Sequence, residues 1–401
     1  MRYHRLMLEW LIVGGGVHGT YLSHYLTQLG RVPRDTLRVL DPHVCSFARW
    51  DRWTANTATD YLRSPDDHHV DVQPESLARF ATTLEGRAAG GVVTDGRRPA
   101  VGLFRAHADE VRRRYQLDAL RLQGTATALT PHDRGWRIET MTGALEARHV
   151  MLAIGPDDTL PWPQWARTLC RRGAPIDHVL DPTFVRSAVG AREHVVVIGG
   201  GISAAQLALA LTEREGGEVT LIARHSPRVH ALDADLPWFG RGEPAEFARE
   251  ADQRQRRNLL GLGRHRGSMP RGTASRLDAA IRTGRLGVRV GEIARAAFLL
   301  DHRSALTPRL RIETADHAMT CDRIVLATGF STKRPGGTWL TRSILAQGLP
   351  TAPCGYPVAD AMLAWRPGLH VCGPLAELQL GAAARSIAGA RRAAEIIGNV
   401  T

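Results

Sequence analysis

Two glycine-rich turns constrain the fold of this chain more than any other feature of its sequence. The first, Gly14-Gly15-Gly16-Val17-His18-Gly19, directly follows the apolar run Trp10-Leu11-Ile12-Val13. The second, Gly199-Gly200-Gly201-Ile202-Ser203-Ala204, follows Val195-Val196-Val197-Ile198. Each run is typical of a buried strand, and each turn opens a helical segment, as in a Rossmann βαβ unit that binds a dinucleotide. The pair predicts a protein that holds two dinucleotides at once and moves electrons between them.

The residue that ends the second strand indicates which dinucleotide the first turn binds. In that turn, Gly14 allows the tight bend, Gly16 lets the backbone approach a pyrophosphate, and Gly19 lets helix and strand pack closely. The strand at 37–40 ends at Asp41, near the ~20-residue spacing at which this fold places an acid. A carboxylate there accepts the ribose hydroxyls of adenosine and repels a 2′-phosphate. We therefore expect FAD or NAD, the alternative being a tight turn without a ligand.

The charge at the corresponding position is reversed after the second turn. The strand at 218–223 ends at Arg224, and Arg228 follows closely. A guanidinium can bind a 2′-phosphate through two hydrogen bonds, which favours NADPH over NADH. The alternative is that Arg224 is merely one of the many arginines. The expected cofactor-binding residues of this unit are Gly199, Gly201, Ser203, Ala204, Arg224 and Arg228.

The net charge of +12 and pI of about 10.4 raise the question of an anionic partner. Lys333 is the only lysine among 52 basic residues, and the arginines are scattered, which indicates compositional bias rather than a binding surface. We therefore expect no nucleic-acid partner. No run approaches the ~18 apolar residues of a membrane span, and the N-terminal apolar run lacks a signal-peptide cleavage site. We therefore expect a cytoplasmic protein, which could form a homo-oligomer.

The cysteine pattern bears on the kind of redox chemistry. No two of the cysteines have C-x-x-C spacing, so neither a redox dithiol nor a zinc site is expected. No H-E-x-x-H pattern is present, and we expect no metal. These absences argue against a disulfide reductase. The cysteines are Cys45, Cys170, Cys321, Cys354 and Cys372.

The order of the expected strands predicts an α/β fold with two Rossmann-like domains, the NADPH domain being inserted into a discontinuous FAD domain. A strand at 149–154 ends in glycine, and the strand at 322–328 ends at Gly329 in the same way. We expect the chain to pass between the domains at these points, with Gly329 near the cofactor. The expected parts are 1–165 for the FAD domain, 166–317 for the NADPH domain with an insertion near 231–275, and 318–401 for the C-terminal part of the FAD domain.

The C-terminal segment adds two further expected cofactor contacts. Gly373 follows a strand at 368–372, and a long helix is expected from Gly381 to Ile397. The positive end of that helix would stabilise negative charge on a reduced flavin ring. The alternative is a helix that only packs against the domain. The insertion, which contains Trp238 and Phe239, is expected to be either a lid over the substrate or a surface excursion.

The two turns, Asp41, the Ala-Thr-Gly-Phe segment at 327–330 and the C-terminal Gly-Ala-Arg-Arg-Ala-Ala helix together resemble class B flavoprotein monooxygenases, and most closely the lysine/ornithine N-hydroxylases. The resemblance implies that NADPH reduces FAD, that reduced FAD forms a C4a-hydroperoxide with O₂, and that a small-molecule substrate, often an amine, takes up the distal oxygen. The alternatives are an FAD-dependent NAD(P)H reductase or dehydrogenase without oxygen insertion and a non-catalytic redox sensor.

The stretch at 61–69 supplies the candidate catalytic residues, because this part of related flavoproteins reaches the flavin ring. Arg63 is expected to bind the flavin or an NADP phosphate. His68 or His69 is expected to exchange a proton near neutral pH. The alternative is a polar loop whose hydrogen bonds are structural.

Overall fold

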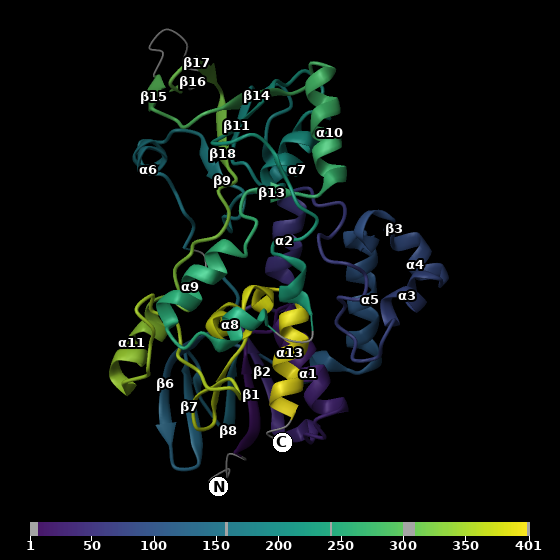
Figure 1. Ribbon diagram of the computed structural model, residues 1–401, viewed down its shortest axis with the longest axis vertical. Coiled ribbons are helices and arrows are strands. Elements are labelled where there is room, and N and C mark those ends of the chain that lie inside the picture. The colour runs from purple at the N-terminus through teal and green to yellow at the C-terminus, as the bar shows by residue number, and fades with distance from the viewer. Residues whose placement is uncertain (1–6, 157–158, 241–242, 300–308, 399–401) are drawn as a thin grey trace.

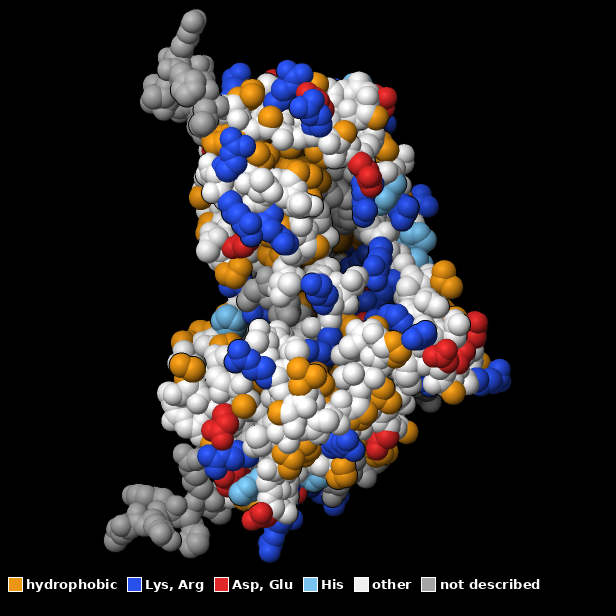
Figure 2. Space-filling view, turned by 90° about the vertical axis from the view of Figure 1, so that its left-hand side faces the viewer, with side chains coloured by type: hydrophobic (Ala, Val, Ile, Leu, Met, Phe, Trp, Pro, Cys, Tyr) orange, Lys and Arg blue, Asp and Glu red, His pale blue; other side chains and the backbone are white. Residues whose placement is uncertain are grey.

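The computed structural model describes residues 7–156, 159–240, 243–299 and 309–398. Two separate parallel sheets dominate it, one in the lower half and one in the upper half of Figure 1. The face in Figure 2 is hollowed between the two halves, and blue Lys and Arg side chains gather around that hollow. The two sheets and their helices confirm the predicted fold class of two Rossmann-like domains.

The lower sheet contains the first glycine turn. Its strands run in the order β19-β20-β8-β1-β2-β5, with the antiparallel pair β6 and β7 attached to β8. Helices α1 (Val17–Gln28) and α13 (Ile387–Gly398) pack together beside it. The strands are β1 (Leu8–Val13), β2 (Leu37–Asp41), β5 (Arg121–Gln123), β6 (Ala126–His132), β7 (Gly135–Thr140), β8 (Gly143–Leu152), β19 (Ala364–Arg366) and β20 (Leu369–Val371).

The upper sheet contains the second glycine turn and is parallel throughout, in the order β14-β11-β10-β18-β9. Its strands are β9 (Ile176–His178), β10 (Val195–Ile198), β11 (Val219–Ala223), β14 (Gly287–Val290) and β18 (Arg323–Leu326). Helices α7 (Ile202–Leu211) and α10 (Arg271–Arg282) pack against each other on it. An antiparallel sheet of β15 (Arg295–Leu299), β16 (Arg309–Glu313) and β17 (Ala318–Cys321) lies beside it.

The expected domain boundaries need correction. β17 and β18 lie after the expected return to the FAD domain at 318, yet β18 pairs with β10 and β9 in the upper sheet. The buried apolar side chains of Ile324, Val325 and Leu326 explain this, because they complete the core between those strands. The expected boundary at 165 also falls inside α6 (Gln164–Cys170), which contacts β9 and β15.

The long C-terminal helix expected from Gly381 is broken. A 3₁₀ turn at Ala382–Arg385 comes first, and Ser386 is extended before α13 begins. The hydroxyl of Ser386 donates to the Ala383 carbonyl at 2.7 Å and accepts from the Gly389 N–H at 3.4 Å. A serine in this position favours a helix start over a helix interior, which accounts for the break.

The insertion of the upper domain packs onto the C-terminal part of the lower domain. Trp238, Phe247 and Leu260 form a small apolar core with Tyr356 and Leu378. The segment therefore bridges the domains, and its Trp238 is a core side chain. Its elements are β12 (Arg228–Val229), a 3₁₀ turn at Leu236–Phe239, α8 (Ala245–Arg249), α9 (Gln253–Leu262) and β13 (Ser268–Met269).

Helix α2 (Ala48–Asn56) also joins the two halves of the molecule (Figure 1). The indole N–H of Trp53 donates to the Leu180 carbonyl at 3.2 Å, and the Asn56 amide donates to the Phe184 carbonyl at 2.7 Å. The remaining elements of the lower domain are α3 (Ser76–Ala81), α4 (Leu84–Ala89), β3 (Val92–Val93), β4 (Arg98–Pro99), α5 (Val101–Arg114), α11 (Gly337–Gln347) and α12 (Glu377–Leu380).

Candidate dinucleotide-binding site

The first glycine turn has the close approaches that its glycines were expected to allow. Gly14 has a φ of +112°, and a Cβ there would lie 2.6 Å from the Ala153 carbonyl oxygen. A Cβ on Gly19 would lie 1.8 Å from the Gly14 oxygen. The Cβ position of Gly16, in contrast, has no atom within 4 Å. Two of the glycines are thus required for packing, while Gly16 leaves open space at the start of α1.

Both helices that follow the glycine turns begin without a cap. Gly16 and Gly201 are the N-cap residues of α1 and α7, and neither helix has a side-chain cap or an acidic residue in its first turn. Uncapped first-turn N–H groups at the positive end of a helix bind anions well. Both starts therefore fit the pyrophosphate of a dinucleotide.

Asp41 closes the first turn from the end of β2. One of its carboxylate oxygens accepts from Gly15 N–H at 2.6 Å, and the other accepts from His43 N–H at 2.8 Å. Arg121 lies 3.6 Å from this carboxylate and donates to the carbonyls of Gly15 and His43. The sequence did not predict the part played by Arg121, because it depends on β5 pairing with β2.

The second turn repeats the backbone geometry of the first. A Cβ on Gly199 would lie 2.4 Å from the Ala327 carbonyl oxygen, as Gly14 approaches Ala153 in the first turn. Ala204, which takes the place of the last glycine, is completely buried. Ser203 lies in the first turn of α7. Ala153 and Ala327 are each the first residue after a neighbouring parallel strand, so equivalent residues frame both turns.

The side chain that packs on the second turn is His225 rather than an acid. A Cβ on Gly200 would lie 2.9 Å from the His225 ring, and one on Gly267 would lie 2.7 Å from the same ring. Gly267 has a φ of +68°, and a Cβ on Gly201 would lie 3.6 Å from its Cα, so the end of the insertion lies over the turn. The sequence gives no sign of the Gly267 contact, because it joins segments that are far apart in the chain.

Arginine side chains surround the second turn. Arg224 is 78 % exposed, and its nearest acidic partner, Glu292, is 3.9 Å away. Arg228 and Arg266 are exposed as well, and a guanidinium N–H of Arg228 reaches the Arg266 carbonyl at 3.5 Å. Exposed, weakly paired guanidiniums suit a 2′-phosphate.

Arg63 does not have the position expected of a cofactor-binding side chain. Its guanidinium donates to the carbonyls of His230 at 2.9 Å and Ala231 at 3.1 Å, and to the Ser268 hydroxyl at 2.8 Å. A further hydrogen bond reaches the Leu232 carbonyl. Because these acceptors use most of its N–H groups, Arg63 fastens the lower domain to the insertion. These bonds favour a structural part for Arg63, and its expected contact with a cofactor stays a prediction.

His68 and His69 are both buried, and neither makes a hydrogen bond to a glycine turn in the described residues. The Arg391 guanidinium donates to Nδ1 of His69 at 3.1 Å and to its carbonyl at 3.0 Å. Burial lowers the pKa of His69 to about 3 and also lowers the pKa of His68. Both rings are therefore neutral at neutral pH, which argues against the expected proton exchange.

The remaining predicted glycines fall into two groups. Gly329 has a φ of +78° and open space at its Cβ position, and a Cβ on Gly373 would lie 3.5 Å from the His18 ring. Gly329 follows β18 of the upper sheet, and Gly373 follows β20 of the lower sheet. A Cβ on Gly381, in contrast, would lie 2.3 Å from the Trp238 ring. Gly381 therefore packs beneath the insertion, and its expected contact with the flavin stays a prediction.

His18 occupies the first turn next to Gly19. Its Nδ1 lies 3.3 Å from the Cys372 thiol, and its ring is hydrogen-bonded to the backbone of Arg385. Burial lowers the pKa of His18 to about 4, although the bond to Arg385 opposes this. The contact places the 3₁₀ turn at Ala382–Arg385 directly beside the first glycine turn.

Glu377 is the most completely buried carboxylate near that turn. It accepts from Arg264 at 2.7 Å and from Arg385 at 2.8 Å, and it also pairs with Arg257. Burial by itself would raise the pKa of Glu377, but the three guanidiniums outweigh it and lower that pKa to about 2. Because Arg257 and Arg264 belong to the insertion, this carboxylate binds the insertion to the lower domain.

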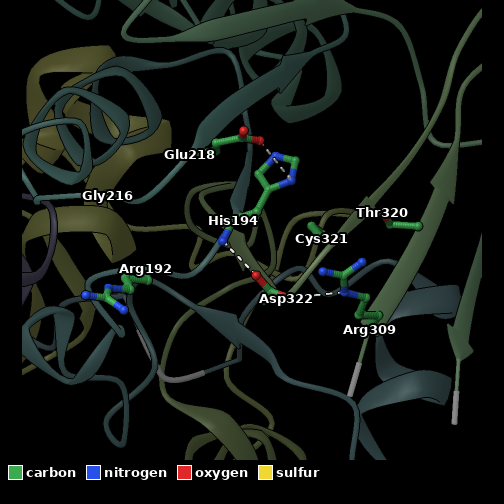
Figure 3. A pocket seen from close by; sticks show the side chains of 8 residues that line it. All are labelled: Arg192, His194, Gly216, Glu218, Arg309, Thr320, Cys321 and Asp322. Atoms are coloured by element: carbon green, nitrogen blue, oxygen red, sulfur yellow. Dashed lines mark hydrogen bonds and ion pairs between the residues drawn. The ribbon is translucent and has the colours of Figure 1, made fainter. Parts of the chain in front are cut away.

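Two cavities differ greatly in size. One of about 330 Å³ lies before the strands β10, β11 and β18, where Asp322 contacts both His194 N–H and Arg309 (Figure 3). Ligands of open α/β sheets bind at the opposite, carboxyl ends of the strands, so this cavity is not the dinucleotide site. A cavity of about 10 Å³ lies between the domains and is lined by Pro156, Ser331, Lys333, Pro335 and Arg385.

Within the described ranges, no helix has both the length and the apolar character needed to cross a membrane. In the same ranges, no group of three or more His, Cys, Asp or Glu side chains is placed to hold a metal ion. All five cysteines are free thiols.

Comparisons with known proteins identify the fold. A family model described as pyridine nucleotide-disulphide oxidoreductase matches residues 193–341, and no curated protein matches the sequence. Ornithine hydroxylase from Pseudomonas aeruginosa has a similar structure, with a TM-score of 0.74, 17% identity and 98% of each chain covered. The FAD-bound cadaverine monooxygenase from Erwinia amylovora has a TM-score of 0.72 at 13% identity, over 98% of this chain and 95% of that one.

An ornithine N-hydroxylase from Kutzneria sp. 744, solved with reduced FAD, NADP⁺ and L-ornithine, has a TM-score of 0.69 at 15% identity. The alignment covers 98% of this chain and 99% of that one. The chain therefore has the fold of the class B flavin monooxygenases, in the form found in ornithine and lysine N-hydroxylases. The structural neighbours are flavin-dependent oxidoreductases.

Proposed function

We propose that the chain is an FAD- and NADPH-dependent monooxygenase that inserts oxygen into a small-molecule amine through a C4a-hydroperoxyflavin. One amine, one O₂, one NADPH and one proton give a hydroxylamine, NADP⁺ and water. The observation that carries this proposal is the pair of uncapped helix starts at Gly16 and Gly201, followed by strand ends of opposite charge. It is supported by a fold whose solved members include complexes with FAD and with NADP⁺.

The first turn is the proposed FAD site. The N-terminus of α1 would bind the pyrophosphate in the open space beside Gly16, and Asp41 would accept a ribose hydroxyl. Arg121 holds Asp41 and the loop after it in place. When bound, FAD supplies the acceptance of hydride and the activation of oxygen, which no side chain can provide.

The second turn is the proposed NADPH site. The N-terminus of α7 would bind that pyrophosphate, and Arg224 and Arg228 would bind the 2′-phosphate. The insertion lies over this turn at Gly267 and over the lower domain at Gly381. It thus touches both proposed sites and limits the access of water to the space between them.

The match to pyridine nucleotide-disulphide oxidoreductases favours a second candidate, an FAD-dependent NAD(P)H reductase or dehydrogenase without oxygen insertion. That match covers the upper domain and the chain's return from it, so it bears on the nucleotide site rather than on the final acceptor. A dithiol acceptor within the chain is not favoured, since all five cysteines are free thiols and no two have C-x-x-C spacing.

Rapid mixing with oxygen separates the two candidates. The FAD-bound protein is reduced anaerobically with one equivalent of NADPH and mixed with O₂, and its absorbance is followed with and without an amine. Monooxygenation predicts a persistent C4a-hydroperoxyflavin spectrum whose decay with amine yields hydroxylamine. Immediate return to oxidised flavin, with hydrogen peroxide formed in equal amount, would favour the reductase.

A further inference from the structure

An excess of positive charge surrounds Glu377 next to the first glycine turn. The cluster consists of Glu377 with Arg257, Arg264 and Arg385, and we call it the arginine cluster. One carboxylate neutralises only one of the three guanidiniums, so the cluster keeps a net positive charge. Their side chains are 27, 13 and 25 % exposed in that order, so the three positive charges are only partly solvated. A poorly solvated positive site of this kind favours an anion.

The arginine cluster borders the space between the two proposed cofactor sites. The backbone of Arg385 is hydrogen-bonded to His18 in the first turn, and its side chain lines the small cavity between the domains. Pro156 and Lys333, which lie where the chain enters and leaves the upper domain, line the same cavity. Figure 2 shows that Lys and Arg side chains gather at the hollow between the two halves of the molecule.

Lys333 also lines this cavity, and its backbone is tied to the arginine cluster. The Tyr356 hydroxyl donates to the Lys333 carbonyl at 3.2 Å and accepts from Arg385 at 3.2 Å, while the Lys333 N–H donates to Ser331 at 3.1 Å. The ammonium itself makes no ion pair in the part of the chain that the structure describes, and the residue is exposed. Lys333 is the one lysine of the chain, and it lies at this cavity.

We propose that the substrate is a net-anionic amine, of the class of amino dicarboxylic acids, and that Lys333 and Arg385 bind its acidic end. The inference rests on the proposed function and narrows its substrate class. Carboxylates would complete the charge balance of the arginine cluster, with Lys333 as a mobile point charge and Arg385 adding positive charge beside it while its fork holds Glu377. Diamines and basic amino acids would bring further positive charge to a site that already has an excess of it.

The arginine cluster also has a structural part, which the test must separate from binding. Arg256 on the same helix donates to the Leu378 carbonyl at 2.7 Å, so α9 is fastened to α12 by more than charge. Substitutions of Arg257 or Arg264 would loosen the insertion whatever the substrate is. Lys333 is the better test residue, because its exposed side chain can be changed without breaking an ion pair.

The test measures binding to the FAD-bound protein in the presence of NADP⁺, by isothermal titration calorimetry and by the change in flavin fluorescence. The ligands are L-glutamate, L-aspartate and L-2-aminoadipate against L-ornithine, L-lysine and cadaverine. We expect at least one acidic amine to bind at least tenfold more tightly than every basic one. Lys333→Gln should weaken that binding about tenfold, the loss of one charge-assisted contact, and Lys333→Arg should restore part of it.

Arg254→Gln is the matched control, since Arg254 is an exposed arginine on α9 outside the arginine cluster. It should leave the dissociation constants unchanged, and melting temperatures should show that every variant is folded. Tighter binding of the basic amines, or acid binding that Lys333→Gln leaves unchanged, would overturn the inference. Failure of the proposed function would look different. None of the amines would be converted to a hydroxylamine, while these binding constants would still be measurable.

Discussion

The two glycine turns share a backbone and differ in the side chain that packs on the middle glycine. In the first turn, the Asp41 carboxylate accepts from Gly15 N–H and is nearly buried. In the second turn, the His225 ring packs against Gly200, while Arg224 at the end of the strand extends into solvent. Equivalent alanine carbonyls, after β8 and after β18, frame both turns. The backbone thus determines that a dinucleotide fits, and the strand end determines which one.

The comparison supports the proposed direction of electron flow, from NADPH to FAD. A buried carboxylate fastened to the turn suits a cofactor that stays bound, whereas exposed guanidiniums suit one that arrives and leaves through solvent. FAD in the first site and NADPH in the second agree with this difference. The insertion lies over the second turn through its Gly267 and packs its Trp238 on Gly381 of the lower domain, so it joins the two domains.

The largest expected effect concerns the last position of each turn. Gly19→Ala would place a Cβ 1.8 Å from the Gly14 carbonyl oxygen, which can move only if helix and strand separate. We expect a loss of about 3 kcal/mol or more in the free energy of unfolding and purification without FAD. Ala204→Gly, the reverse change in the second turn, should cost about 1 kcal/mol. Urea unfolding and the FAD content of the purified variants check both expectations. Equal losses of unfolding free energy in the two variants would contradict the difference between the two turns.

The next effect is a pH dependence that belongs to the first turn alone. Burial lowers the pKa of His18 from 6.5 to about 4 in the folded protein, so the unfolded chain takes up its proton first. Burying the neutral His18 ring therefore costs the protein nothing in proton uptake above pH 6.5. As the pH falls from 6.5 towards 4, the free energy of unfolding decreases by up to about 3 kcal/mol. His18→Ser, which introduces the residue type of Ser203, should make the unfolding free energy less steep over pH 4–6.5. Parallel pH profiles for the wild type and the variant would contradict this assignment.

A charge reversal at the second strand end should alter nucleotide preference. Arg224→Asp removes a charge-assisted contact and adds repulsion towards a 2′-phosphate. We expect the KM for NADPH to rise roughly 10- to 100-fold and the KM for NADH to change little. Steady-state NAD(P)H oxidation measures both. Equal changes in the two constants would show that Arg224 does not contact the 2′-phosphate.

The smallest effect concerns the ring on the second turn. His225→Ala removes the imidazole that packs on Gly200 and Gly267, but leaves the uncapped start of α7 unchanged. We expect the KM for NADPH to rise by about threefold and the NADPH to NADH preference to stay the same. A change in preference as large as that of Arg224→Asp would assign the 2′-phosphate contact to His225.

The features that the sequence predicted are local ones. Both turns, the strands beside them and the charges of Asp41 and Arg224 follow from residues close in the chain, because glycine spacing and apolar runs act over short distances. The predicted return of the chain to the FAD domain at 318 was wrong, because β18 pairs with β10 and β9 in the upper sheet. The break at Ser386 replaces the expected continuous helix, because a serine hydroxyl competes with the helical hydrogen bonds.

The features that the sequence did not predict depend on distant pairs. Arg63 donates its hydrogen bonds to the insertion, and Arg121 on β5 forms an ion pair with Asp41 on the neighbouring strand β2. Glu377 collects arginines from two domains, which no local pattern signals. In each case a charged residue is held by groups far away in the chain, and spacing along a sequence carries no information about such pairs.

The most direct measurement of the central claim is anaerobic reduction of the FAD-bound protein with NADPH and with NADH. If the first turn holds FAD and the second holds NADPH, one equivalent of NADPH bleaches the flavin absorbance. NADH at the same concentration then does so at least tenfold more slowly, and Arg224→Asp removes that difference. A protein that purifies without flavin, or whose flavin NADH reduces as fast as NADPH does, would contradict the assignment of the two turns.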